Sequence, residues 1–338
     1  MYSGLEDAKE SQYLKILRKY LPEYKKLFNL EDFRDDLTKF SFLKIKYDLT
    51  KCIQKTKNDK NSRMVPILIS YKTEKIQIFD LIEEKVQDGH LLYVPIPPES
   101  IGIFYHIYTC LIEEFGLEIL EEVSQKIQTQ TIRKDQCVKA LTDYLHDKEK
   151  RKAVIQWFLG EELSENEKDL LGFESSIQED DKSLEMIRLI GETSSKVILL
   201  YFDDIELPLE KYGESAQRRL LEGLKRVHHN VKQLIIILIC PEKKWSSIKD
   251  LADESFTSIL ESKLNFYNFF DVKALIVERN DDFWSKRDMI PPEEEYFPFD
   301  ESDITFFFEK SKGDISKFLK VYLKMIYKFL SGELSESQ

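Results

Sequence analysis

The chain has 338 residues, and only 11 of them are glycine, about half the usual share. Lys and Arg number 50 against 62 Asp and Glu, so the formal net charge is −12. A charge of this sign disfavours sequence-independent binding to the phosphate backbone of nucleic acids. Because no two glycines are closer than ten residues, the motifs GxGxxG, GxxxxGK[ST] and GxSxG are all absent.

The four cysteines lie far apart in the sequence, at Cys52, Cys110, Cys137 and Cys240. They form no CxxC pair and have no histidine at ligand spacing, which disfavours a zinc site or a disulfide framework. The longest apolar runs, Val197–Phe202 and Leu234–Cys240, are too short to cross a bilayer. The first residues, MYSGLEDAKES, do not have the pattern of a signal peptide. We therefore expect a cytoplasmic protein without a membrane span.

The N-terminal residues are predicted to be helical. Apolar residues recur there at helical spacing: Leu14, Leu17, Leu21, Tyr24 and Phe28. Pro22 is expected to bend or split this helix. A second helical stretch runs from about Asp36 to Lys57, and the polar segment Asn58–Ser62 is expected to be a loop.

The next segment alternates between strands and helices. Met64–Ser70 and Leu91–Ile96 are short apolar runs predicted as buried strands, with a helix between them that ends at Gly89. Ile101–Phe115 is a strongly apolar helix that Gly116 terminates. This order predicts a βαβ unit and a parallel sheet.

A polar, helical pattern without a strand extends from residue 117 to residue 195, where Ser164 and Glu167 fit a capping box. Strands are then predicted at Lys196–Asp203, Leu234–Cys240 and Asp271–Val277. The helices expected in this part of the chain are Glu214–His229, Ser255–Leu264, Asp300–Lys310 and Ile315–Phe329.

The segment Ile198–Glu206, ILLYFDDIE, carries the clearest chemical signal. Its apolar strand ends in Asp203 and Asp204, at the sheet edge where ligands bind in open α/β folds. In P-loop ATPases an aspartate at this place holds the Mg²⁺ shell, and the next acidic residue orients the attacking water. A solvated strand end is the alternative interpretation of the same two carboxylates.

With these elements in this order, the chain resembles the AAA+/STAND class of ATPases, especially the branch near the origin-recognition initiator ATPases. The resemblance covers roughly residues 40 to 330. Asp203 and Asp204 resemble its Walker B pair, with Asp204 in place of the usual Glu, and Tyr296–Lys324 resembles its helical lid. Leu234–Cys240 resembles the strand that carries the first sensor, and Lys263 takes the place of an arginine. The resemblance implies an α/β fold with a parallel AAA+-like (P-loop NTPase) sheet core.

The Walker A loop that the resemblance implies after Val65–Ile69 is degenerate. Its two glycines, its lysine and its Ser/Thr are replaced by Ser70, Lys75, Ile76 and Gln77, and the lid arginine is Ser316. Lys72 or Lys75 remains able to reach a phosphate, but the loop carries Cβ atoms where close backbone approach is needed. We therefore expect a pseudo-ATPase with no cofactor and no metal, in which Asp203 and Asp204 are a Walker B remnant.

Four segments are expected: an N-terminal helical segment 1–57, a core 58–290 with a helical insertion at about 117–195, a lid 291–331 and a tail 332–338. The favoured function is that of a protein-binding or regulatory subunit whose partner is an ATPase of the same class or an effector. One alternative is a weak or nucleotide-gated ATPase that uses Lys72 or Lys75 to bind Mg-ATP. The other is a nucleic-acid-associated accessory factor with a local basic patch. The net charge of −12, and an end of the sequence within about ten residues of the lid, disfavour nucleic-acid binding by the chain alone.

Overall fold

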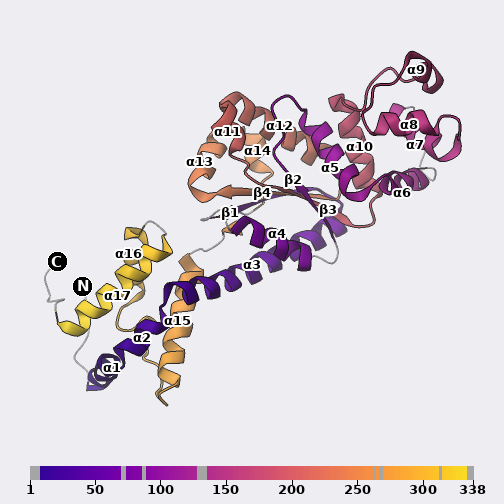
Figure 1. Cartoon of the computed structure of the whole chain (residues 1–338). Helices are drawn as coiled ribbons and strands as arrows, with labels where there is room; N and C mark the ends of the chain where they lie inside the picture. The colour runs from indigo at the N-terminus through magenta and orange to yellow at the C-terminus, as the bar shows by residue number, and fades with distance from the viewer. Residues whose placement is uncertain are drawn as a thin grey trace. The chain divides into compact units, whose positions relative to one another are not determined.

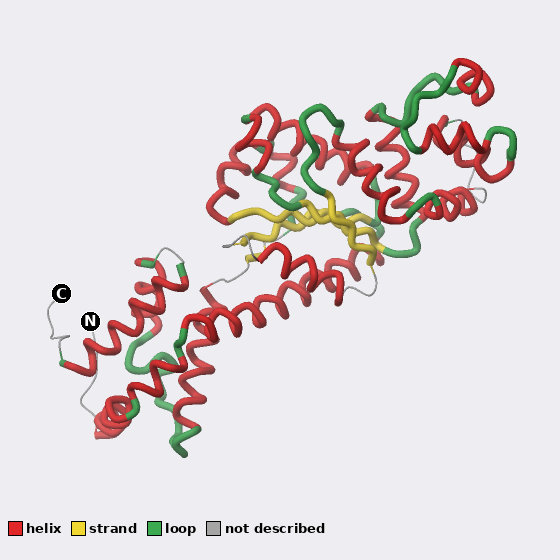
Figure 2. The backbone as a smooth tube through the Cα atoms, viewed as in Figure 1, coloured by secondary structure: helices red, strands yellow, loops and turns green. Residues whose placement is uncertain are grey.

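The computed structural model describes residues 8–69, 74–85, 89–127, 135–261, 264–265, 269–311 and 314–332. Contacts divide the chain into two compact units, which we describe separately. The sheet unit comprises Ile45–Phe266, and the helical unit comprises Met1–Lys44 together with Tyr267–Gln338. The strands of the described residues all belong to the sheet unit (Figure 2).

The sheet unit is built on a parallel sheet with the strand order β2-β3-β4-β1-β5. The strands are β1 Arg63–Ile69, β2 Gly89–Val94, β3 Val197–Phe202, β4 Leu234–Pro241 and β5 Leu264–Asn265. Every residue of β3 is buried, as are seven of the eight in β4, which explains their continuous apolar sequences. Ile69 pairs with Pro241 and Phe202 pairs with Leu238, so β1, β3 and β4 end at the same edge.

Helices cover both faces of the sheet: α4 lies on one face, and α5, α10 and α12 lie on the other (Figure 1). The helices outside the insertion are α4 Glu74–Lys85, α5 Ile103–Phe115, α11 Leu207–Tyr212, α12 Glu214–Asn230, α13 Glu242–Leu251 and α14 Glu254–Ser258. The helix α3, Leu30–Asp59, contributes residues to both units.

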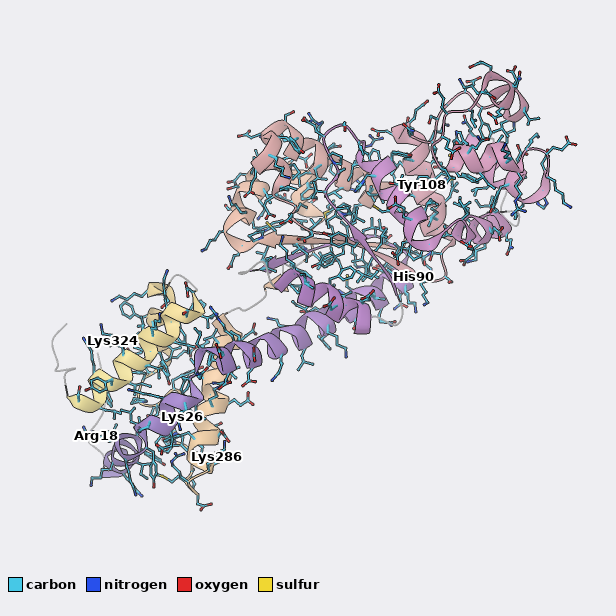
Figure 3. All side chains as sticks on the ribbon, viewed as in Figure 1. Arg18, Lys26, His90, Tyr108, Lys286 and Lys324 are labelled. Atoms are coloured by element: carbon cyan, nitrogen blue, oxygen red, sulfur yellow. The ribbon has the colours of Figure 1, made fainter. Side chains whose placement is uncertain are left out.

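The described part of the segment between α5 and β3 consists of helices joined by loops and contains no strand. Its helices are α6 Glu118–Ile127, α7 Gln136–His146, α8 Arg151–Phe158, α9 Glu165–Leu171 and α10 Asp180–Thr193. Their apolar side chains join the core of the strands, and Trp157 is among the largest buried residues. Tyr108 of α5, labelled in Figure 3, donates a hydrogen bond to the carbonyl oxygen of Phe158 at 2.9 Å. The insertion is therefore packed as part of the sheet unit.

The helical unit joins residues from both ends of the chain in one core. Besides the first part of α3, its helices are α1 Ala8–Lys19, α2 Leu21–Leu27, α15 Phe269–Ser285, α16 Glu301–Lys310 and α17 Ile315–Ser331. Its core combines Tyr24 of α2 and Phe28, which directly follows α2, with Trp284 of α15 and with Phe318 and Tyr322 of α17.

The fold class expected from the sequence is confirmed in its elements: an α/β fold with N-terminal helices, a parallel sheet core, a helical insertion and a closing helical pair. Local signals are confirmed too. Pro22 lies in the first turn of α2 after the break from α1, Gly116 ends α5 with a φ of 67°, and Ser164 and Glu167 form the capping box of α9.

Three local predictions are wrong. Asp271–Val277 is the start of α15 and not a strand, because Val272, Leu275 and Ile276 all face the core of the helical unit at helical spacing. Gly89 begins β2, where it pairs with Val197, and does not end a helix. Within Ser255–Leu264 the helix is restricted to the short α14, because the chain returns to the sheet as β5.

Along the chain, the boundaries between the two units lie after residue 44 and after residue 266. The boundaries of the core expected from the sequence lie after residue 57 and after residue 290. The physical reason for the difference lies in the core of the helical unit. The residues of α15 share that core with the N-terminal helices and the closing pair, and only sequence-distant contacts reveal this arrangement.

Candidate functional site

The candidate site begins where β3 ends. Asp203 follows the buried Phe202, and Asp204 has a φ of 52°, a left-handed conformation that aspartate tolerates better than most residues. The N–H of Asp204 donates to Oδ1 of Asp203 at 2.6 Å, and the carbonyl oxygen of Asp204 accepts from the N–H of Leu207 at 2.8 Å. This turn leads into α11 and holds both carboxylates at the sheet edge.

Lys75, in the first turn of α4, contacts both carboxylates. Its Nζ lies 2.8 Å from Oδ1 of Asp203 and is also paired with Asp204. The side chains of Lys75, Asp203 and Asp204 are 7%, 15% and 40% exposed. The hydroxyl of Tyr201 on β3 donates to the carbonyl oxygen of Lys75 at 2.8 Å, which fixes the start of α4 to the sheet.

The two carboxylates determine the charge state of Lys75. Burial acts to lower the pKa of Lys75, but the hydrogen bonds that its ammonium group donates to Asp203 and Asp204 outweigh burial and raise the pKa above its ordinary value. The ammonium group is therefore charged at neutral pH. It neutralises part of the negative charge that would otherwise attract a divalent cation to this edge.

Glu206 adds a third, buried carboxyl group to this region. Its side chain is 5% exposed, and its Oε2 has no hydrogen-bond partner among the residues that the structure describes. Burial raises the pKa of Glu206, whereas Lys75 acts to lower it. Sequence reasoning did not single out Glu206, although it closes the ILLYFDDIE segment, because nothing local distinguishes a buried glutamate from an exposed one.

Of the residues predicted for the site, the structure brings together Lys75, Asp203 and Asp204. Ser70 and Lys72 lie outside the described residues, as does Lys263. Gln77 belongs to α4, where only its backbone is described. Ser316 lies in the first turn of α17, in the helical unit.

A pocket of about 840 Å³ lies on the sheet unit away from this site, beside the start of α5 and along α11 and α12. Its walls combine Pro97, Pro98 and Tyr212 with Arg219, which forms an ion pair with Glu99 at 2.5 Å. The lining does not include Lys75 or the two aspartates.

The described ranges contain neither a candidate metal centre nor a candidate membrane-spanning helix. In those ranges, no three His, Cys, Asp or Glu side chains converge in a way that could hold a metal ion. None of the described helices combines the length and the apolar character that a membrane span requires.

Among known proteins, only solved structures show a similarity to this chain. No protein-family model matches the sequence, and no curated protein matches it. The chain is similar to a chain of Drosophila ORC bound to GC-rich DNA and Cdc6, with 9% identity and a TM-score of 0.37 over 98% of this chain. It is also similar to a chain of Drosophila ORC bound to DNA, with 9% identity and a TM-score of 0.38 over 93% of this chain. This chain spans 44% of the length of each of these two chains.

Proposed function

We propose that this protein is a catalytically inactive AAA+-like pseudo-ATPase that acts as a protein-binding or regulatory subunit of a larger complex. The observation that carries the proposal is the contact of the Lys75 ammonium with both Asp203 and Asp204. In an ATPase of this class these two positions serve a hydrated Mg²⁺ ion and the attacking water. Here they serve a side chain of the same chain.

Releasing the two carboxylates for Mg²⁺ would require Lys75 to leave a largely buried position. Breaking a buried ion pair by removing one partner destabilises a protein by about 3–5 kcal/mol, because an uncompensated charge remains. Binding of Mg-ATP would have to offset a similar loss before gaining any affinity. The described residues therefore do not fit a Mg-nucleotide group, and we propose that the chain uses no such cofactor.

The sequence of the phosphate loop supports the same proposal. No glycine occurs between Gly4 and Gly89, so the loop after β1 has no residue that lets the backbone approach a phosphate without a Cβ atom. The sheet core and its covering helices are nevertheless complete enough to bury a continuous core. An intact core whose two site carboxylates are neutralised by a lysine is typical of a subunit that binds other proteins. The partner that we propose is an ATPase of the same class or an effector.

Calorimetry of the full chain with Mg-ATP and Mg-ADP tests the loss of nucleotide binding. We expect no heat of binding at nucleotide concentrations up to about 1 mM, and no rise in the unfolding temperature. A ligand at a hundred times its Kd stabilises a protein by about 2.7 kcal/mol, so a site of about 10 μM affinity would be obvious in the thermal measurement. Micromolar binding would contradict the proposal.

Turnover is the second measurement, because it separates this proposal from a weak or nucleotide-gated ATPase. Any phosphate release by the purified chain should be the same in the wild type and in Asp203→Ala. A background rate that disappears in Asp203→Ala and persists in a control such as Glu149→Ala, an exposed residue of the insertion, would establish the ATPase instead.

A further inference from the structure

The outer face of α17 carries a row of lysines. The helix buries the side chains Ile315, Phe318, Leu319, Tyr322, Ile326 and Leu330 in the core of the helical unit. On the opposite side lie Lys317, Lys320, Lys324 and Lys328, spaced by three, four and four residues. The helix contains no acidic residue. One face of α17 is therefore apolar, and the face turned away from the core is basic.

Three of these lysines form no ion pair with an acidic side chain of the described ranges. Lys317 approaches Asp314 at 3.6 Å, but in the described part of the chain no carboxylate forms an ion pair with Lys320, Lys324 or Lys328. By contrast, Lys273 and Lys286 of α15 are paired with Glu301 and Asp282. Like charges four residues apart destabilise a helix by about 0.2–0.5 kcal/mol per pair. The row thus opposes the stability of α17 until something neutralises it.

The neighbouring helix α2 extends the same surface. Tyr327 of α17 is 52% exposed, and the Nζ of Lys25 on α2 lies 5.4 Å from the centre of its ring. Figure 3 labels Lys26 on α2 and Lys324 on α17. We call Lys25, Lys320, Lys324, Lys328 and Tyr327 the lysine face. It combines four positive charges with one exposed aromatic ring.

We propose that the lysine face docks an acidic helix of a partner protein. Lysines at intervals of three and four residues recur about once per 5.4 Å turn, so the row from Lys317 to Lys328 spans about 16 Å. Carboxylates at the same intervals on a second helix present negative charges at matching distances. The ring of Tyr327 supplies apolar contact area beside these charges.

The charge of the whole chain favours a protein partner over nucleic acid. A net charge of −12 repels a polyanion at long range, whereas a single acidic helix carries only a few charges. Non-specific binding to nucleic acid also depends on many simultaneous phosphate contacts, and this row offers few cations. The inference rests on the proposed role as a protein-binding subunit and names a surface and a partner chemistry for it.

The test uses the full chain and a labelled helical peptide of about 20 residues with glutamates at intervals of three and four. K320E/K324E/K328E alters the lysine face, and K211E/K243E/K249E makes the same charge change at exposed lysines of the sheet unit. We expect the lysine-face variant to bind the peptide at least about tenfold more weakly, and the control variant to remain within about twofold of the wild type. A peptide of the same composition with scrambled spacing should bind more weakly. Circular dichroism verifies that both variants are folded.

Three results would overturn the inference. The first is the absence of peptide binding at low salt, and the second is an equal loss of peptide binding in both variants. The third is a short DNA duplex that binds the wild type more tightly than the peptide does and no longer binds K320E/K324E/K328E. The last result would assign the face to nucleic acid. None of them bears on the calorimetry with Mg-ATP, so a failure here is distinct from a failure of the pseudo-ATPase proposal.

Discussion

The hydroxyl groups of Tyr24 on α2 and Tyr322 on α17 lie 2.8 Å apart, although 298 positions separate the two residues. The hydroxyl of Tyr24 also donates to Oδ1 of Asn280 on α15 at 2.7 Å. Both rings are completely buried. This chain of hydrogen bonds links three helices inside an apolar core and connects the N-terminal helices to the closing pair within one compact unit.

The direction of these bonds predicts unequal effects of two conservative substitutions. Tyr24→Phe leaves both the acceptor of Asn280 and the donor of Tyr322 without their partner, and we expect a loss of about 1–3 kcal/mol in the free energy of unfolding. Tyr322→Phe leaves the bond from Tyr24 to Asn280 intact and should destabilise less. Urea unfolding of both variants and of the double variant gives the coupling energy of the pair. Equal losses, or full additivity, would contradict this network.

Removing the cation of the candidate site is predicted to destabilise the sheet unit. In Lys75→Met the largely buried carboxylate of Asp203 loses its partner, so we expect a loss of up to about 3–5 kcal/mol in the free energy of unfolding. Lys249→Met, at an exposed position of α13, is the matched control and should change stability by less than about 0.5 kcal/mol. Adding Asp203→Asn to Lys75→Met should restore part of the loss. A Lys75→Met protein as stable as the wild type would show that the carboxylates do not depend on this ammonium group.

Glu206 predicts a change of stability with pH. Because burial raises its pKa in the folded state, the folded protein binds this proton more tightly than the unfolded chain. Stability therefore falls as the pH rises from the ordinary pKa of glutamate through the raised pKa of Glu206. Glu206→Gln should remove this loss, so that the variant is more stable than the wild type at pH 7 and differs little from it below the ordinary pKa.

Urea midpoints measured across this pH range for Glu206→Gln and for the exposed control Glu149→Gln check the effect. The control should follow the wild type at every pH. A Glu206→Gln protein whose advantage grows towards acid pH would reverse the sign of the argument.

The features that sequence reasoning recovered are those encoded by neighbouring residues. The apolar runs of β3 and β4 predict buried parallel strands because such strands are covered on both faces. The capping box of Ser164 and Glu167 closes within four residues. The strand predicted at Asp271–Val277 is wrong, because a short apolar run of this kind fits a buried strand and a buried helix equally well. Only the packing of Val272 and Ile276 against the N-terminal helices decides for α15.

In the candidate site too, some features follow from neighbouring residues and others from contacts between residues far apart in the sequence. Asp203 and Asp204 follow from the end of a predicted strand, since an apolar run that stops at two carboxylates is a local pattern. Their pairing with Lys75, which lies far away in the sequence, depends on how α4 starts beside β3. The burial of Glu206 likewise follows from the packed fold and not from its neighbours in the chain.

Two of the few glycines, Gly191 and Gly223, lie inside helices, and their surroundings predict different effects of substitution by alanine. A Cβ atom at Gly191 of α10 would lie 2.8 Å from the carbonyl oxygen of Lys232 and 2.7 Å from a methyl group of Val231. At Gly223 of α12 the nearest atom to such a Cβ is a methyl group of Ile103, which a change of rotamer can move away. Backbone atoms have no such freedom, so Gly191→Ala should lose about 1–3 kcal/mol in the free energy of unfolding despite the better helix propensity of alanine. Gly223→Ala should lose less when both are compared by urea unfolding.

If Gly191→Ala were the more stable of the two, the close approach of α10 to the segment before β4 would not be a constraint, and the glycine there would need another explanation.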